Sequence, residues 1–169
     1  VSGAAIRHGI ESNVILEDPD YATPIDMVYN TIELTLDHVL WRRLIRKSLY
    51  IDNNITAFEG VNIGEDHYTL PRLAYFAKKI SKIDDVVYNY NCMNPDSYTS
   101  EMKSHFNLVK FQNDISSIGI LCSFFNDRDV YCVNRLKVIQ KEYIKNSLYL
   151  CCLLSDKLSY EMIVKELGI

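Results

Sequence analysis

Residues 58–66 read Phe58-Glu59-Gly60-Val61-Asn62-Ile63-Gly64-Glu65-Asp66 and lead directly into a helical pattern. The glycines predict a loop, and Gly64 allows the backbone to turn sharply just before the helix. We expect that helix over residues 65–79, with Pro71 bending it after its first turn. Glu65 and Asp66 then lie on the first turn, about 100° apart around the helix axis.

Two adjacent carboxylates in this position have a simple structural explanation. Acidic side chains are common at helix N-termini because they complement the helix dipole and accept hydrogen bonds from free N–H groups. Glu65 fits that role. Because Asp66 points in a different direction, it need not have the same role.

The region before residue 37 is predicted to contain one strand and one helix. Residues 1–20 are expected to be irregular apart from a short strand over 13–16. Thr23-Pro24 reads as a helix N-cap followed by proline at the first helical position. The apolar residues that follow recur at helical spacing, which predicts a helix over 24–36.

Shorter elements flank the central loop. Leucine, tryptophan and isoleucine predict a strand over residues 40–45, and a short helix is expected over 48–53. After the central helix, alternating isoleucine, valine and tyrosine predict a strand over 80–90. The polar segment 91–100 contains Asn94-Pro95-Asp96-Ser97 and reads as a loop.

From residue 101 onward the pattern is helical. One helix is marked by apolar residues at helical spacing, namely Phe106, Val109, Ile115, Ile118 and Leu121. A second helix is expected over 129–154 and a last one over 160–167. We therefore predict an α/β fold class, with a partial mixed sheet flanked by helices in residues 1–100 and a helical C-terminal extension in 101–169.

The composition indicates an ordinary globular chain. It has 169 residues, of which 48% are hydrophobic and 24% charged, and a formal net charge of −4. Such a charge argues against a nucleic-acid binder, which usually has a basic face. Apolar runs are far shorter than a membrane span, and no signal peptide is visible.

The five cysteines predict neither a disulfide framework nor a zinc site. They stand at 92, 122, 132, 151 and 152, mostly within apolar runs, and none forms a CxxC pair. The histidines at 8, 38, 67 and 105 fall at no ligand spacing relative to them. We expect reduced, buried cysteines in a cytoplasmic protein.

Three blocks, in the same order, resemble segments of the family 2 glycosyltransferases. The first resembles the family's LWNKLIRRSLY segment, the second its GED segment, and the third its Y-x-Y and N-P-x-S-Y-T loop. Together they cover residues 35–100. In this chain the blocks read Leu40-Trp41-Arg42-Arg43-Leu44-Ile45-Arg46-Lys47-Ser48-Leu49-Tyr50, then Gly64-Glu65-Asp66 with Pro71-Arg72-Leu73 and Ala77-Lys78-Lys79-Ile80, then Val87-Tyr88-Asn89-Tyr90 with Asn94-Pro95-Asp96-Ser97-Tyr98-Thr99.

The resemblance implies a GT-A fold and an inverting transfer of a sugar from a nucleotide-sugar donor to a carbohydrate or lipid-linked acceptor, in polysaccharide biosynthesis. The aspartate of the family's segment is the general base, which assigns that role to Asp66. A carboxylate within hydrogen-bond reach of the acceptor hydroxyl suits this chemistry. Glu65 beside it adds negative charge, which favours a more basic Asp66.

The chain departs from the family pattern in two places. Arg42-Arg43 replaces the family's Asn-Lys, which keeps positive charge but changes its shape. In the family, a donor-binding half with an Asp-x-Asp metal motif precedes the GED segment. The residues before Gly64 in this chain are too few to form that half. The resemblance therefore implies a divalent metal, Mg or Mn, with ligands outside this chain, and a 169-residue chain that is inactive alone.

Asp18-Pro19-Asp20 has the form of a metal motif, since paired carboxylates bind Mg²⁺ with a diphosphate. However, no nucleotide-binding unit precedes it, and acidic turns around proline are common. We assign no metal ligand within the chain.

The remaining substrate-binding candidates come from the same blocks. Trp41 suits a stacked sugar ring but also suits a hydrophobic core, while Arg72 suits a diphosphate or a structural ion pair. Asn94 and Ser97 have side chains that can contact substrate, although a simple turn explains them equally well. Glu65 completes the set, and His67 reads as a helical surface histidine.

A different class of function fits the same residues. In that alternative the chain is a non-catalytic α/β interaction module, and Glu65 and Asp66 only cap a helix. The enzyme hypothesis places the protein in the cytoplasm, at the inner face of the membrane if it associates peripherally.

Overall fold

The computed structural model describes residues 2–8, 13–16, 22–33, 38–61, 64–91 and 106–168. The chain forms two compact units, Val1–Pro95 and Asp96–Ile169. Within these described ranges, the first contains three strands and three helices, and the second contains three helices. Helices predominate in this mixed α/β chain, which agrees with the predicted class at that coarse level.

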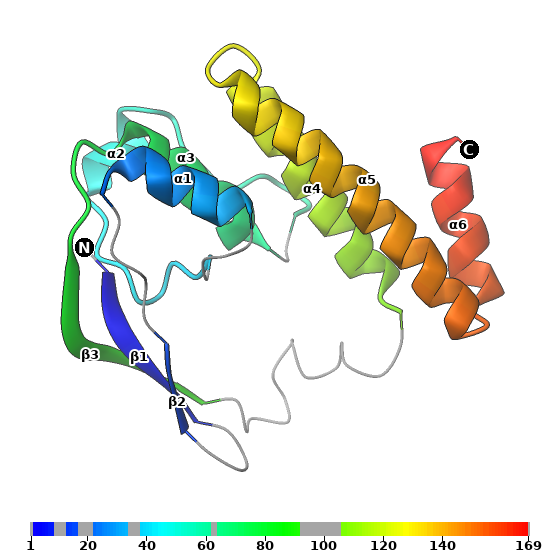
Figure 1. The fold of residues 1–169 in the computed structure, drawn as a ribbon, viewed down its shortest axis with the longest axis horizontal. Coiled ribbons are helices and arrows are strands. Elements are labelled where there is room, and N and C mark those ends of the chain that lie inside the picture. Colours follow the sequence, from blue (N-terminus) through cyan, green and yellow to red (C-terminus); the bar gives the residue numbers. More distant parts are fainter. Residues whose placement is uncertain are drawn as a thin grey trace. The chain divides into compact units, whose positions relative to one another are not determined.

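The first unit is built on two helices that pack side by side, α1 (Pro24–Ile32) and α3 (Glu65–Phe76) (Figure 1). Their buried apolar side chains form its core; these are Met27, Val28, Ile32, Tyr68, Leu70 and Leu73. Each such side chain contributes about 1.5–3 kcal/mol when fully buried. The short helix α2 (Lys47–Ile51) also contacts α3.

A capping box starts α1 where the sequence predicts it. Thr23 Oγ1 accepts a hydrogen bond from the Asp26 backbone N–H at 3.3 Å, and Asp26 Oδ2 accepts one from the Thr23 N–H at 2.8 Å. Pro24 follows at the first helical position. The helix ends at Ile32, with Glu33 as its C-cap, and not at residue 36 as predicted.

The strands form one sheet in the order β2-β1-β3. β1 (Ser2–His8) pairs antiparallel with β2 (Asn13–Leu16) and parallel with β3 (Lys82–Asn91). The strands at 13–16 and near 80–90 are thus confirmed. The prediction that residues 2–8 are irregular is wrong, because Gly and Ala have weak strand propensity and the pairing with distant β3 decides their conformation.

The predicted strand over residues 40–45 is also wrong. This segment turns, and the Arg43 N–H donates to the Leu40 carbonyl oxygen at 3.0 Å. Arg42 is buried in this turn. The central helix α3 ends at Phe76 instead of residue 79, because Ala77 adopts an extended backbone conformation.

The second unit consists of α4 (Leu108–Phe125), α5 (Val130–Leu153) and α6 (Lys157–Leu167). Each N-cap side chain, from Asn107, Asp129 and Asp156, accepts a hydrogen bond from the backbone N–H three residues later. The cap at Asp156 starts the last helix three residues before the predicted position. Phe111, Cys151 and Ile163 form the buried centre of this unit.

The described cysteines, 122, 132, 151 and 152, are all free thiols. Cys132 and Cys151 are buried as expected, but Cys152 is exposed. Burial, with a smaller contribution from Asp129, raises the pKa of Cys132 to about 12, so its thiol is unreactive at neutral pH. Within the described ranges, no helix combines the length and apolar character needed to cross a bilayer.

Candidate functional site

Asp66 lies on the first turn of α3, and this helix begins directly after a residue in the left-handed conformation. Gly64 is the N-cap of the helix, with φ 78° and ψ 22°, a conformation that glycine adopts without strain. Its carbonyl oxygen accepts a hydrogen bond from the His67 N–H at 2.9 Å. From this turn Glu65 is exposed to solvent, whereas Asp66 is half-buried. The two carboxylates therefore have different surroundings.

Tyr50, from α2, is a residue whose ionisation responds to the charge of Asp66. Burial raises the pKa of Tyr50 above its ordinary value, and the negative charge of Asp66 raises it further. Tyr50 consequently remains a neutral phenol at physiological pH. The negative charge of Asp66 therefore acts electrostatically on the Tyr50 hydroxyl.

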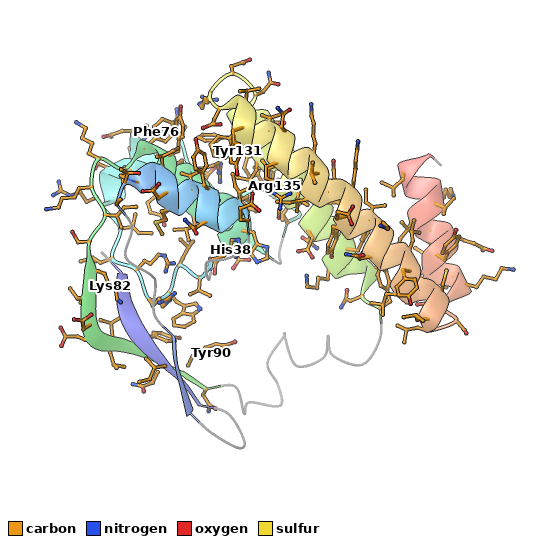
Figure 2. The ribbon with its side chains drawn as sticks, in the orientation of Figure 1. His38, Phe76, Lys82, Tyr90, Tyr131 and Arg135 are labelled. Atoms are coloured by element: carbon orange, nitrogen blue, oxygen red, sulfur yellow. The ribbon has the colours of Figure 1, made fainter. Side chains whose placement is uncertain are left out.

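Two histidines, His38 and His67, contact each other next to the first turn of α3. The rings of His38 and His67 are 4.4 Å apart between centroids and tilted by 43°. His38 Nε2 lies 2.8 Å from the Thr31 carbonyl oxygen, and since a carbonyl only accepts, this nitrogen carries the proton. His67 therefore packs against a ring from the segment after α1, and Figure 2 shows His38 in that segment.

Arg72 is buried within the first unit, with 4% of its surface exposed. Its Nε donates to the Tyr68 carbonyl oxygen at 2.7 Å and its Nη2 to the Thr56 carbonyl oxygen at 3.0 Å. The guanidinium also lies 5.1 Å from the ring centroids of both Phe58 and Tyr68. Burial lowers the pKa of Arg72 from its ordinary value. These contacts hold the loop before α3 onto the helix.

Phe58 and Tyr68 make two further contacts between the loop before α3 and the helix. The Phe58 N–H donates to the Tyr68 hydroxyl at 3.1 Å. The two rings meet edge to face with centroids 5.5 Å apart. The loop segment that contains Thr56 and Phe58 is therefore anchored to two buried residues of α3, Tyr68 and Arg72.

Trp41 contacts two tyrosines of β3. Its indole ring lies 4.4 Å from the Tyr88 ring and 5.3 Å from the Tyr90 ring between centroids, and it is nearly parallel to the latter, at 13°. Figure 2 shows Tyr90 near the end of β3. The sequence predicted Trp41 as a substrate residue but assigned no role to the tyrosines. Their spacing of two on a predicted strand was the available signal, because it places both on one face.

Some of the sequence candidates lie outside the described residues, namely Asn94, Ser97, Asp18 and Asp20. Where the structure is described, no three His, Cys, Asp or Glu side chains gather in a way that could hold a metal ion. The described side chains near Asp66 thus form no ligand set for the Mg or Mn that the resemblance implies.

The second unit has an open pocket of about 300 Å³ between α4 and α5 that the sequence did not indicate. Its lining includes Asn107, Lys110 and Tyr143. Asp114, beside this pocket, accepts a hydrogen bond from the Tyr143 hydroxyl at 2.6 Å. It also forms an ion pair with Lys110. The pocket therefore combines a cation already paired to a carboxylate with amide and aromatic side chains.

Comparison with known proteins leaves the family open. No protein-family model matches the sequence, and neither the curated proteins nor the solved structures include a significant match. The likeness to family 2 glycosyltransferases therefore rests on the three sequence blocks alone.

Proposed function

We propose that the chain is the acceptor-side portion of an inverting glycosyltransferase of the GT-A type, with Asp66 as the general base. The enzyme transfers a sugar from a nucleotide-sugar donor to a hydroxyl of a glycan or another acceptor, in cytoplasmic polysaccharide biosynthesis. Peripheral association with the membrane is part of the same proposal. The supporting observation is the half-buried position of Asp66 on the first turn of α3, beside an exposed Glu65.

In the proposed reaction, a carboxylate oxygen of Asp66 takes the proton of the acceptor hydroxyl. The acceptor oxygen forms a bond to the anomeric carbon, while the bond from that carbon to the diphosphate oxygen breaks. The electron pair of the broken bond leaves with the nucleoside diphosphate. Attack from the opposite face inverts the anomeric centre.

Glu65 and Arg72 have supporting roles in this proposal. Exposed Glu65 complements the positive end of the α3 dipole. Arg72 fixes the loop that leads to Asp66, through the carbonyl oxygen of Thr56. Arg72 is thus a positioning residue for Asp66 rather than a diphosphate ligand. No step assigned to these residues runs through a metal ion.

The test compares Asp66→Asn with Glu65→Gln in the longest gene product that contains this chain. Transfer is measured against a panel of uridine, guanosine and thymidine diphosphate sugars with short oligosaccharide acceptors. Loss of the base should lower kcat about 10²- to 10⁴-fold. Glu65→Gln should leave kcat within about threefold, since it removes only a helix-terminus charge. Undiminished kcat in Asp66→Asn would remove Asp66 as the base.

Exposed leucines favour the second candidate, a non-catalytic interaction module. Leu153, Leu154 and Leu158, around the turn between α5 and α6, are each more than half exposed. Exposed apolar patches often mark interaction sites. This candidate predicts no sugar transfer by any gene product that contains the chain, so the same assay separates the two.

A further inference from the structure

Three aromatic rings gather on one face of β3. Tyr88 and Tyr90 are two positions apart on this strand, so their side chains point to the same side of the sheet. Trp41, from the turn before α2, contacts both rings. Because it meets two tyrosines of the same face, the indole lies across that face of the strand.

This cluster, Trp41 with Tyr88 and Tyr90, is partly exposed to solvent. Tyr88 is 38% exposed, and Trp41 and Tyr90 are half-buried. Among the described residues, no hydrogen bond involves the indole N–H of Trp41 or the hydroxyl of either tyrosine. The cluster therefore has flat apolar faces, and each of its three rings carries one polar group at its rim.

The rings are also held in place before any ligand arrives. The turn that carries Trp41 is closed by the hydrogen bond from the Arg43 N–H to the Leu40 carbonyl oxygen. The backbone that carries Tyr88 and Tyr90 is held by the parallel pairing of β3 with β1, in register with Ala5 and Arg7. A preorganised surface loses less entropy on binding than a mobile one.

We infer that the aromatic cluster is a saccharide-binding platform. It takes the apolar face of a hexopyranose ring whose hydroxyls are equatorial. Such a ring presents C–H groups on its face, which stack on the aromatic rings, and hydroxyls at its rim, which bond to the indole N–H and the tyrosine hydroxyls. This inference deepens the proposed function and rests on it, because the proposed function is what identifies the platform as the acceptor site. It specifies an acceptor that is a β-linked glycan rather than a lipid or protein hydroxyl.

The single tryptophan makes the platform directly observable. Titration of the 169-residue chain with cellotetraose and with chitotetraose should change Trp41 emission in a saturable way. In a ¹H–¹⁵N spectrum of the same protein, the one indole cross-peak should shift along the same titration. Decaproline is the competing probe, because aromatic grooves also bind polyproline helices.

The variants separate stacking from hydroxyl contacts. Tyr88→Ala and Tyr90→Ala should each raise the Kd about two- to tenfold, the loss of one aromatic contact. Tyr88→Phe keeps the ring and removes only the hydroxyl, so it should raise the Kd by less. It takes the place of Tyr88→Ala in the comparison if the alanine variant does not fold. Tyr149→Ala is the matched control, since Tyr149 is an exposed tyrosine of α5 and its loss should leave the Kd unchanged.

The inference is overturned if neither tetrasaccharide changes Trp41 emission or shifts its cross-peak. It is equally overturned if decaproline binds and the tetrasaccharides do not, or if folded Tyr88→Ala binds as the wild type does. A catalytic assay distinguishes this failure from failure of the proposed function. Loss of the platform should raise KM for the glycan acceptor with kcat retained, whereas Asp66→Asn lowers kcat.

Discussion

The Nη2 atom of Arg72 donates a hydrogen bond to the carbonyl oxygen of Thr56 at 3.0 Å. This bond joins the body of α3 to the loop that leads into the same helix. Phe58, from that loop, lies against the guanidinium on one side and against the ring of Tyr68 on another. The loop segment at Thr56 and Phe58 is therefore held by a buried cation from α3, the helix whose first turn carries Asp66.

Arg72→Lys tests this anchor. Lysine keeps the charge but loses the planar fork that reaches two carbonyl oxygens and two aromatic rings. We expect the free energy of unfolding to fall by about 1.5–3 kcal/mol, the loss of a charged hydrogen bond at a buried site. Urea unfolding followed by far-UV circular dichroism measures the change.

Arg128→Lys provides the control for that measurement. Arg128 makes the same kinds of contact, with its Nη1 2.6 Å from the Phe124 carbonyl oxygen and its guanidinium 4.6 Å from the Phe124 ring centroid. It is exposed, so its replacement should change stability by no more than about 0.5 kcal/mol. Equal effects of the two replacements would contradict the anchoring role of Arg72.

Gly64→Ala tests the backbone turn that aims Asp66. With φ at 78°, a side chain at this position is strained, and we expect a loss of about 1–2 kcal/mol in unfolding free energy. Gly119→Ala is the opposite case. Gly119 lies inside α4 with nothing within 4 Å of an added Cβ, so alanine there should stabilise by about 0.5–1 kcal/mol. Thermal unfolding of both variants checks the signs, and a stabilising Gly64→Ala would exclude the strained turn.

Tyr143→Phe tests the buried network of the second unit. It removes the hydrogen bond to Asp114 Oδ2, and the expected cost is about 0.5–1.5 kcal/mol at pH 7. A Leu158→Ala variant, at an exposed position of α6, should have a much smaller effect. Chemical unfolding at neutral pH measures both changes.

The same network predicts a pH dependence. Burial, followed by the hydrogen bond to Asp114, raises the pKa of Tyr143. In the unfolded chain a tyrosine loses its proton near pH 10, whereas folded Tyr143 retains it, so the unfolded state binds fewer protons above that pH. This contribution to stability is complete below about pH 10 and falls as pH rises further. Tm measured from pH 8 to 11 should fall less steeply in Tyr143→Phe, and parallel curves would refute the assignment.

Local chemistry made several elements predictable. Thr23-Pro24 starts α1 because a β-conformation threonine and a proline suit the first helical positions. Asp129 starts α5 in the same way, through its bond to the Cys132 N–H. Gly64 precedes α3 in the left-handed conformation that glycine tolerates. In each case the determining interaction spans only a few residues.

Non-local contacts explain the errors. The leucine, tryptophan and isoleucine residues of segment 40–45 suggested a strand, yet the segment turns and leaves Arg42 buried. The strand β1 has a weak local signal and depends on β3, which is far away in the sequence. Burial of Arg72 depends on Thr56 and Phe58 arriving from the preceding loop. Helical spacing alone does not contain that information.

By itself, the amino-acid sequence determined where α1 and α5 begin and that two carboxylates share the first turn of α3, because caps and turns are short-range. The tertiary structure alone decided that Glu65 is exposed and Asp66 half-buried, and that Arg72 supports the loop segment at Thr56 and Phe58. It also decided that Trp41 meets Tyr88 and Tyr90. Burial and ring contacts of this kind arise only when segments distant in the chain pack together.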